Sequence, residues 1–372
     1  MIVKLADVTE EVKSNNKGDK SGCRIVGLEH LTPSDVTLSN WSEDTNNTFT
    51  KEFAKGDVLF GRRRAYLKKA AYAPFSGICS GDITVIRPKE DKIYPKLLPF
   101  VIQNDYLFDY AVGKSAGSLS PRVKWEHLKR YEFVLPEHGK QIQLANTLWA
   151  INETKNAYKK LINEIDELVK SQFIEMFGNY DTIRLDKIAK ISAGQSSPKE
   201  DEFSEEGTPF IKAGNLEGLK LHQYEEYNCN LVSPEIAGKK KLKIHETGTI
   251  LVAKSGMSCN SGHVYVLKEE AYVVSHLACI KPNKNVPSNY IKIFFIVTGV
   301  QSLIKDAGYP SIQLGQFAEM SVPNAPYELM EEFDVFVRRS DKSKFALQES
   351  IKNLDALSKK IIAENLVSEG KE

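Results

Sequence analysis

The sequence predicts an α+β fold built from two tandem globular domains, each followed by a long helix, with approximate twofold symmetry between the two halves. Short strand-like runs with Gly and Pro give way to a long heptad-patterned stretch, and both patterns then recur. The residue numbers of Tyr158 and Leu347, which occupy equivalent helix positions, differ by 189 (347 − 158). A chain of 372 residues is also long enough for two or three domains. The predicted segments are a first domain at 1–137, a central helix at 138–178, a second domain at 179–324 and a C-terminal helix at 325–372.

The composition is ordinary for a soluble protein, and the net charge is small. Fifty Lys and Arg residues face 49 Asp and Glu residues, which counts against a dedicated nucleic-acid binder. Basic residues nevertheless cluster at 62–64, 68–69 and 239–241, and a neutral total can hide a basic face. No apolar run approaches the ~20 residues of a membrane span, and 1–5 has no signal-peptide layout. The five cysteines lack Cys-x-x-Cys spacing, so we expect reduced thiols in a cytoplasmic protein without membrane association.

The first domain shows short runs rich in β-branched and aromatic residues. They predict strands at 23–28, 57–60, 83–87 and 131–135. One helix is predicted from Pro95 to about Val112, because apolar residues there recur at helical spacing.

The central helix is predicted from its uninterrupted heptad pattern. No Pro or Gly occurs from Lys140 to Phe177, and at ~1.5 Å per residue this helix is roughly 55–60 Å long. Gly178-Asn179 is typical of a helix end. Eight of the ten heptad core positions that begin at Leu144 are apolar. The helix-pairing residues predicted in this segment are Leu144, Leu148, Ile151, Tyr158, Ile162 and Ile165.

The second domain repeats landmarks of the first. Residues 184–188 resemble 4–8, 248–252 resemble 56–60, and 212–215, which begins at Lys212, matches 26–29, which begins at Val26. The offset between such landmarks drifts, so the loops have diverged in length while the framework recurs.

The C-terminal helix carries the same register as the central one. Adding 189 to the central positions gives six apolar residues out of ten, and Lys155 and Lys344 break the same heptad site. Neither helix is hydrophobic enough to stand alone, so we expect the two to pack as an antiparallel coiled coil. The alternative is that each helix packs back onto its own domain as an ordinary core helix. The helix-pairing residues predicted here are Leu347, Ile351, Leu354 and Ile361.

Catalytic and metal-binding patterns are not found in the sequence. Gly113-Lys114-Ser115 resembles the end of a phosphate-binding loop, but Phe108 stands where the first glycine is needed. The seven histidines show no metal-ligand spacing. Asp57 and Asp82 each follow a glycine, and such turn residues are usually structural. We therefore predict a binding protein with no catalytic residue, no metal and no cofactor of its own.

Basic and polar loops are the candidates for DNA contact. Arginine forks suit guanine edges and phosphates, whereas lysines mainly neutralise phosphates. Small residues in the loop 113–122 would let the backbone approach phosphates closely. The loop 254–260 of the second domain is poorer in charge but rich in short hydrogen-bonding groups, so the two domains would contact different bases. The alternative is that these loops are merely solvated. The predicted DNA-binding residues are Arg62, Arg63, Arg64, Lys68, Lys69, Lys114, Ser118, Arg122, Lys212, Asn215, Lys254, Ser255, Ser258 and Asn260.

Taken together, these motifs resemble the specificity subunit of type I restriction-modification enzymes. The resemblance rests on the duplicated domain, the Gly-Asp-Val-Leu-Phe strand at 56–60, the Ser-Pro-Arg-Val loop that leads to Val-Leu-Pro at 134–136, and the long helix that follows. It covers nearly the whole chain. It implies two target recognition domains, one for each half of a split double-stranded DNA site, and helices that space them and dock two methylation subunits. Those partners would carry S-adenosylmethionine and methylate adenine, and restriction subunits would add cleavage that depends on ATP and Mg²⁺.

Two other functions remain open from the residues alone. The chain could be a DNA-modifying enzyme, such as a nuclease or methyltransferase, with an unrecognised active site, or a coiled-coil scaffold that binds only proteins. Activity of the purified chain would favour the former. Tolerance of alanine replacements across 62–69 would favour the latter.

Overall fold

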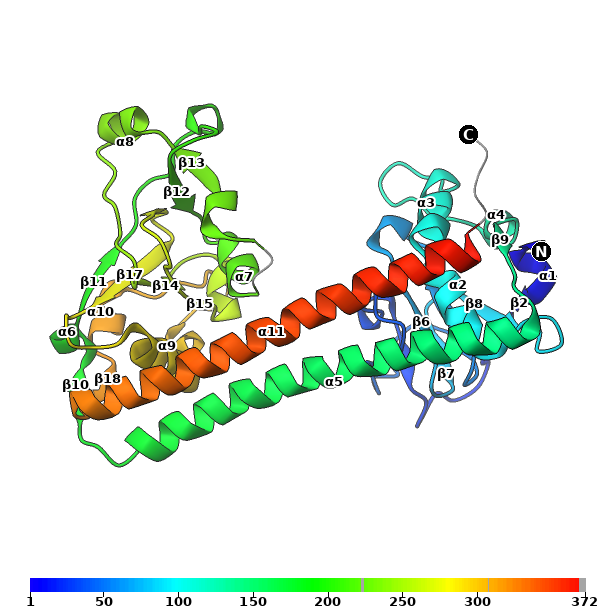
Figure 1. The fold of residues 1–372 in the computed structure, drawn as a ribbon, viewed down its shortest axis with the longest axis horizontal. Helices are drawn as coiled ribbons and strands as arrows, with labels where there is room; N and C mark the ends of the chain where they lie inside the picture. Colours follow the sequence, from blue (N-terminus) through cyan, green and yellow to red (C-terminus); the bar gives the residue numbers. More distant parts are fainter. Residues whose placement is uncertain (222–223, 307, 368–372) are drawn as a thin grey trace. The chain divides into compact units, whose positions relative to one another are not determined.

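The computed structural model describes residues 1–221, 224–306 and 308–367, and it divides into two compact units. Unit 1 contains Met1–Tyr158 together with the chain from Glu349 onward, and unit 2 contains Lys159–Gln348. Both long helices contribute to both units, and Figure 1 follows the chain through them by colour. Among the described residues, no helix combines the length and the apolar character needed to cross a membrane.

Unit 1 is built on a four-stranded sheet and a three-stranded sheet with a hydrophobic core between them. The larger sheet has the order β2-β8-β5-β6, with antiparallel neighbours throughout. Its strand β5 is buried on both faces, because Leu59 packs in the core beside the smaller sheet, whereas Val58 and Phe60 pack in the core beside the helices. The strands of the larger sheet are β2 (Thr9–Glu11), β8 (Ile83–Pro88), β5 (Val58–Gly61) and β6 (Ala70–Tyr72). Those of the smaller sheet are β3 (Ile25–Val26), β7 (Gly77–Cys79) and β4 (Lys51–Phe53), and β1 (Ile2–Lys4) pairs separately with β9 (Glu132–Val134).

The predicted strands of the first domain are confirmed, although the first is shorter than expected. The run 23–28 forms β3 only at Ile25–Val26, because the 3-10 helix η1 (Leu28–His30) follows directly. The helix predicted from Pro95 to Val112 is wrong as a single element. Asn104 interrupts it and accepts a 3.0 Å hydrogen bond from the Tyr106 amide, which caps the next helix. The helical elements in this part of the chain are α1 (Leu5–Val8), η2 (Ala65–Leu67), η3 (Pro95–Leu97), α2 (Leu98–Ile102), α3 (Asp105–Gly113) and α4 (Trp125–Leu128).

Unit 2 repeats this framework. Its larger sheet has the order β11-β17-β14-β15, which corresponds strand for strand to β2-β8-β5-β6. These strands are β11 (Ala189–Ala193), β17 (Leu277–Pro282), β14 (Ile250–Ala253) and β15 (Val264–Val266). The others are β13 (Asn230–Val232), β12 (Thr208–Ile211) and β16 (Tyr272–Val273), with β10 (Thr182–Arg184) paired to β18 (Ser321–Pro323). The helices are α6 (Leu185–Ile188), α7 (Asn215–Lys220), α8 (Pro234–Lys240), α9 (Ser288–Thr298) and α10 (Leu314–Ala318), with 3-10 turns η4 (Glu200–Glu202), η5 (Glu226–Asn228), η6 (Met257–Ser261) and η7 (Val300–Leu303).

The two units differ at the edge of the smaller sheet. Both contain an equivalent parallel pair, β3 with β7 in unit 1 and β12 with β16 in unit 2. The third strand joins opposite members of this pair, because β4 pairs with β7 whereas β13 pairs with β12. The duplicated framework has therefore diverged where its loops are longest.

The two long helices are α5 (His138–Phe177) and α11 (Tyr327–Leu366). The first agrees with its predicted range to within one residue, and the second begins two residues later than predicted. The end of the second predicted range, 368–372, lies outside the described residues. In unit 1, Leu144, Leu148, Ile362 and Leu366 belong to one hydrophobic core. In unit 2, side chains from both helices again share one core, namely Val169, Phe173, Phe177, Met330, Phe333 and Val337. Of the predicted pairing residues, Leu144, Leu148 and Ile151 are buried, and the rest are half-buried: Tyr158, Ile162, Ile165, Leu347, Ile351, Leu354 and Ile361.

The strict heptad register is wrong at the end of each helix. The residues buried there are Phe173 and Phe177 in α5, rather than Gln172 and Met176. In α11, Ile362 is buried and Ile361 is only partly so. A straight α-helix drifts relative to a 3.5-residue repeat, and these turns pack on a globular core that does not require that repeat. Phe173 and Ile362 again differ by 189 (362 − 173), so both copies depart from the heptad pattern at the same place.

Two equivalent ion pairs join the long helices, one inside each unit. In unit 1, Lys155 of α5 bonds Asp355 of α11. In unit 2, Lys344 of α11 donates to Asp166 of α5 at 2.7 Å. Each pair is the other's counterpart under the 189-residue repeat (344 − 155 and 355 − 166). The lysine that interrupts each heptad pattern thus has a specific partner.

Candidate nucleic-acid interface

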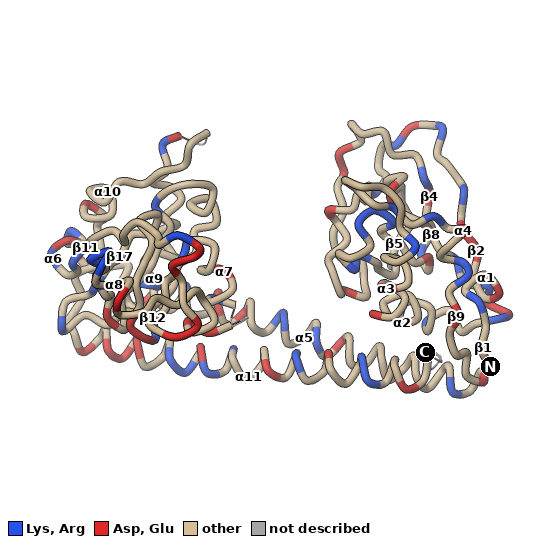
Figure 2. Tube along the Cα trace, turned by 90° about the horizontal axis from the view of Figure 1, so that it is seen from above, with Lys and Arg blue, Asp and Glu red and all other residues tan. Residues whose placement is uncertain are grey.

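Two predicted DNA-binding loops of unit 1, 62–69 and 113–122, lie against each other at the end of β5. The Arg64 amide donates to the Pro121 carbonyl at 2.8 Å, and the Val123 amide donates to the Arg62 carbonyl at 3.0 Å. A third segment joins them, because the Arg62 amide donates to the Asp82 carbonyl in the turn before β8. Figure 2 shows basic stretches of the trace beside β5.

The side chains at this junction form a charged cluster around Asp82. Arg122 donates from Nε to Asp82 Oδ1 at 2.7 Å and from Nη2 to Oδ2 at 3.4 Å. Arg63 Nη1 lies 3.6 Å from Asp82 Oδ2, and Arg63 Nε donates to the Ser120 hydroxyl at 2.5 Å. The hydrogen bond from Arg122, helped by the charges of Arg122, Arg63 and Arg62, lowers the pKa of Asp82. The cluster therefore carries one carboxylate between two partly exposed guanidinium groups at neutral pH.

Some of the remaining basic side chains of these loops are exposed, and others form hydrogen bonds within the domain. Arg64 and Lys114 are exposed, as is Ser118. Arg64 adopts a left-handed conformation (φ 54°) that starts η2. Lys68 donates to Asp105 at 2.6 Å, and Lys69 donates to the Leu28 carbonyl at 2.7 Å. These two lysines hold the loop in place, so their charge is already partly compensated inside the domain.

Unit 2 builds the same backbone junction from different residues. The Lys254 amide donates to the His276 carbonyl at 2.9 Å, the Gly256 amide to the Pro310 carbonyl at 3.0 Å and the Ile312 amide to the Lys254 carbonyl at 2.8 Å. These bonds correspond to those of Arg62, Arg64 and Val123 in unit 1. Gly256 also has a positive φ (78°), like Arg64. The two loops are therefore structural equivalents, as the sequence predicted.

The side chains on this second junction are largely neutral. Ser255 stands in the place of Arg63 and His276 in the place of Asp82, and a 2.7 Å hydrogen bond joins Ser255 Oγ to His276 Nδ1. Ser311 stands in the place of Arg122, because each forms a β-bridge to the equivalent residue of the first loop. Ser258 is half-buried and Asn260 is exposed in the same loop. The two junctions thus present charged forks in one unit and short polar groups in the other.

Lys212 and Asn215 lie in a turn, and their polar groups form hydrogen bonds within unit 2. Asn215 Oδ1 accepts from the Lys212 amide at 2.8 Å, just as His30 Nδ1 accepts from the Gly27 amide in unit 1. Lys212 Nζ bonds Glu200 at 2.9 Å and lies 4.5 Å from the Phe203 ring centroid. The sequence alignment of Lys212 with Val26 is wrong by one residue, because the equivalent hydrogen bond is that of Gly27. The drift in loop length concealed this shift.

Sequence reasoning missed the roles of Asp82 and His276. Asp82 was visible only as a turn residue after a glycine, and His276 only as a histidine without metal-ligand spacing. Their equivalence depends on pairing across the sheet, which no local motif carries. Asp57, the other aspartate after a glycine, is structural as expected. It is buried, accepts from the Ala54 amide at 2.7 Å and binds Arg87 through both carboxylate oxygens.

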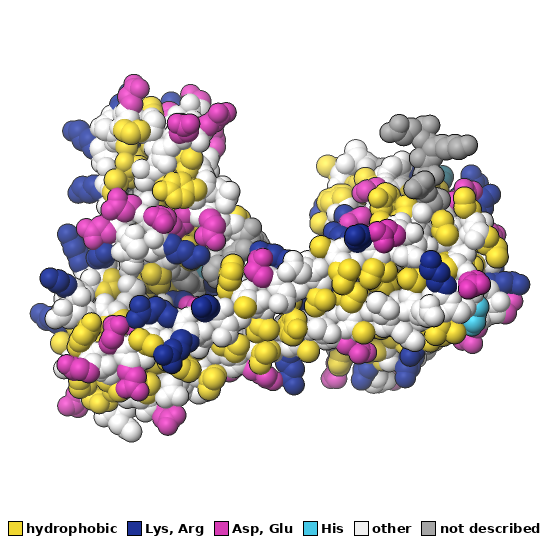
Figure 3. All heavy atoms as spheres, viewed as in Figure 1, with side chains coloured by type: hydrophobic (Ala, Val, Ile, Leu, Met, Phe, Trp, Pro, Cys, Tyr) yellow, Lys and Arg dark blue, Asp and Glu magenta, His cyan; other side chains and the backbone are white. Residues whose placement is uncertain are grey.

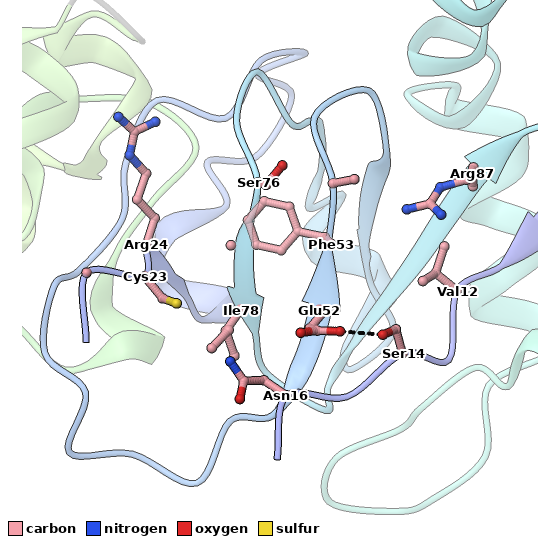
Figure 4. A pocket seen from close by; sticks show the side chains of 13 residues that line it. Val12, Ser14, Asn16, Cys23, Arg24, Glu52, Phe53, Ser76, Ile78 and Arg87 are labelled. Carbon is pink, nitrogen blue, oxygen red and sulfur yellow. Dashed lines mark hydrogen bonds between the residues drawn. The ribbon is translucent and has the colours of Figure 1, made fainter. Parts of the chain in front are cut away.

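A separate groove of about 530 Å³ lies in unit 1 beside the smaller sheet (Figure 4). Ser14 bonds Glu52 across it, and Arg24 lies over the rings of Trp41 and Phe75 at 4.5 and 4.4 Å from their centroids. None of its lining residues belongs to the loops 62–69 or 113–122. Over the described residues, no group of three or more His, Cys, Asp or Glu side chains could hold a metal ion. On the face drawn in Figure 3, basic and acidic side chains are interspersed over each unit, in keeping with the net charge of +1.

Comparison with known proteins agrees with this duplicated architecture. The chain is 23% identical over 314 residues to the type I restriction enzyme MjaIX specificity subunit of Methanocaldococcus jannaschii, covering 77% of this chain and 71% of that protein. Its fold is similar to the S subunit of a type I restriction-modification system from M. genitalium (TM-score 0.56, 14% identity, 100% of this chain and 96% of that one). A chain from a structural study of the complex assembly and conformational transition of a type I R-M system is equally similar (TM-score 0.56, 17% identity, 98% and 97% covered).

The family model described as the type I restriction modification DNA specificity domain matches the chain twice, over residues 3–167 and 178–364. These two matches coincide with the two copies of domain and helix found in the structure. The protein therefore belongs to the family of type I restriction-modification specificity subunits and carries the DNA specificity domain in duplicate.

Proposed function

We propose that this chain selects the DNA target of a type I restriction-modification complex, and that each domain recognises one half of a bipartite, double-stranded site. The observation that carries the proposal is the loop junction built twice on the same backbone bonds, with Arg63, Asp82 and Arg122 in one copy and Ser255, His276 and Ser311 in the other. Two domains that recognise different base sequences need the same backbone framework with different hydrogen-bonding side chains on it, and the two junctions have this arrangement.

The two long helices pack, in this proposal, as an antiparallel coiled coil that spaces the domains. The support is the equivalent Lys155–Asp355 and Lys344–Asp166 pairs, because a polar residue at a core position selects register and partner. At ~1.5 Å per residue, a 40-residue helix is about 60 Å long, enough to span half-sites one DNA turn, ~34–36 Å, apart.

Two methylation subunits dock on these helices and do the chemistry. They bind S-adenosylmethionine and methylate adenine, while restriction subunits cleave DNA in a reaction that depends on ATP and Mg²⁺. The complex works in the cytoplasm. A base must leave the stack to be methylated, which favours a partner that holds the duplex. This chain itself is non-catalytic. The Ser255–His276 bond has the distance of a nucleophile and its base, but the equivalent positions in unit 1 hold Arg63 and Asp82, which are suited to binding.

The test is a domain exchange in the complex with methylation subunits. Residues 1–137 are replaced with the first domain of another specificity subunit, and methylated adenines are mapped in genomic DNA. We expect a change in one half of the methylated motif only. A change in both halves, or in neither, would contradict the proposal, as would methylation by the purified chain alone.

A further inference from the structure

The bidentate bond between Arg122 and Asp82 leaves the outer donors of that guanidinium available. A guanidinium has five N–H groups, and Asp82 occupies one on Nε and one on Nη2. The three that remain, on Nη1 and Nη2, form the end-on fork that matches O6 and N7 of guanine. The side chains of Arg122 and Asp82 are 44% and 23% exposed, so the fork is accessible while its anchor is largely covered.

The anchor is held by its own surroundings. Asp82 lies in the turn before β8, where its carbonyl accepts from the Arg62 amide and its own amide donates to Ser80 Oγ at 3.2 Å. Arg63 donates a hydrogen bond to Ser120, and its Nη1 also lies 3.6 Å from Oδ2 of the same Asp82 carboxylate. A long arginine side chain normally loses rotamer entropy when it binds, and an anchored one has lost it already.

We propose that Arg122, positioned by Asp82, contacts a guanine in the major groove of the half-site recognised by the first domain. This inference rests on the proposed function, and it specifies one residue of the first domain and the base that this residue contacts. Asp82 acts as a positioning residue, because it holds the guanidinium in the plane that the guanine edge requires. Its carboxylate also disfavours an arrangement in which Arg122 merely neutralises a phosphate, since Asp82 already compensates part of that charge.

The second domain has no such fork at the equivalent position. Ser311 replaces Arg122, and the Ser255–His276 pair replaces Arg63 and Asp82. Short hydroxyl and imidazole groups make one or two hydrogen bonds and accept more than one base edge. The half-site of the second domain therefore does not depend on an arginine-bound guanine at the corresponding base pair.

The experiment uses the complete methylating complex with the full chain, and it maps methylated adenines in genomic DNA for each variant. Asp82→Asn keeps the size of the side chain but removes the charge that orients Arg122. We expect the preference for guanine at one base pair of one half-site to fall roughly tenfold, with the other half-site unchanged, because one bidentate base contact is lost or disordered. Arg122→Lys keeps the charge, loses the fork, and is expected to relax the same base pair.

The matched control is Asp186→Asn. Asp186 also accepts a guanidinium, from Arg184 at 2.7 Å, but this exposed pair lies outside both loop junctions. We expect its methylated motif to equal that of the wild type. Thermal melting of each variant identifies any loss of folding. If Asp82→Asn does not fold, the guanine preference of the Arg122→Lys complex tests the inference instead.

The outcomes separate this inference from the proposed function. A wild-type complex that methylates without sequence preference would overturn both. A specific wild-type motif that stays unchanged in folded Asp82→Asn and Arg122→Lys complexes would overturn the inference alone. Equal relaxation of both half-sites would also overturn it, because an effect confined to the first domain is required.

Discussion

Single residues of this chain carry different chemistry on a shared backbone. Arg64 and Gly256 occupy equivalent turns with positive φ, yet one is a cation and the other has no side chain. A left-handed conformation is easy for glycine and costs an arginine about 1 kcal/mol. A cation kept there despite that cost is suited to contact with a phosphate. Asp82 and His276 likewise occupy equivalent positions, because their carbonyls accept equivalent hydrogen bonds from the Arg62 and Lys254 amides.

Two histidines of unit 2 are expected to make its stability sensitive to mild acid. Burial lowers the pKa of His245, and burial with the nearby charge of Lys220 lowers that of His263. The unfolded chain takes up these protons near pH 6.5, whereas the folded domain resists them, so stability falls as pH drops below that value. We expect the melting temperature to decrease from pH 7 to pH 5.5, and His245→Gln to reduce that decrease.

The control for this prediction is His127→Gln, because His127 is exposed on α4 of unit 1. Its variant should keep the full wild-type dependence on pH. Melting curves in one buffer series provide the measurement. An unchanged dependence in His245→Gln would show that other groups are responsible.

At the scale of elements, the long helices show where heptad reasoning applies and where it ends. The pattern predicted the extent of α5 and the start of α11 to within two residues, because the absence of Pro and Gly and the apolar spacing are local properties. The buried residues Phe173 and Ile362 fall one position beyond the heptad register. At these turns the partner surface is a globular core, and only its shape determines which side chain is covered.

The Lys155–Asp355 pair is expected to select register more than to supply stability. Lys155→Met should leave the free energy of unfolding nearly unchanged, because the Asp355 side chain is 47% exposed and its charge therefore stays solvated when the lysine is lost. Lys155→Glu places a second carboxylate beside Asp355 and should cost about 1–3 kcal/mol, with the double variant Lys155→Glu/Asp355→Lys recovering much of that cost.

Urea denaturation of the wild type, Lys155→Met, Lys155→Glu and the double variant measures how each change alters the free energy of unfolding. Lys160→Glu is the matched control, since Lys160 is 78% exposed and its pair with Glu164 is on the surface. We expect a change of no more than about 0.5 kcal/mol there. A double variant as unstable as Lys155→Glu alone would argue against this pair.

At the scale of the whole molecule, near-zero net charge is unusual for a protein that selects DNA. A chain with 50 basic and 49 acidic residues has almost no excess positive charge, and Lys68 and Lys69 are already engaged inside unit 1. If methylation subunits dock on this chain as proposed, we expect them to supply much of the counterion release that drives protein–DNA affinity.

We therefore expect DNA binding by the complex to depend more strongly on salt than DNA binding by the chain alone. The slope of log affinity against log salt concentration should be steeper for the complex with methylation subunits than for the chain alone, because each added phosphate contact contributes about −0.9 to the slope. Fluorescence anisotropy with a duplex that contains the methylated motif, at salt concentrations from 50 to 200 mM, tests it. Equal slopes would mean that this chain supplies the phosphate contacts itself.

The amino-acid sequence by itself determined the duplication, the α+β character of each domain, the two long helices and the general place of the polar loops. These follow from local pattern and from a constant spacing, both of which are readable along the chain. Tertiary structure alone decided which residues stand opposite each other. It aligned Asp82 with His276, moved the equivalence of Lys212 from Val26 to Gly27, and joined Lys155 to Asp355. Such pairings depend on strand registry and helix packing between residues far apart in sequence, and loops of unequal length erase them from any linear comparison.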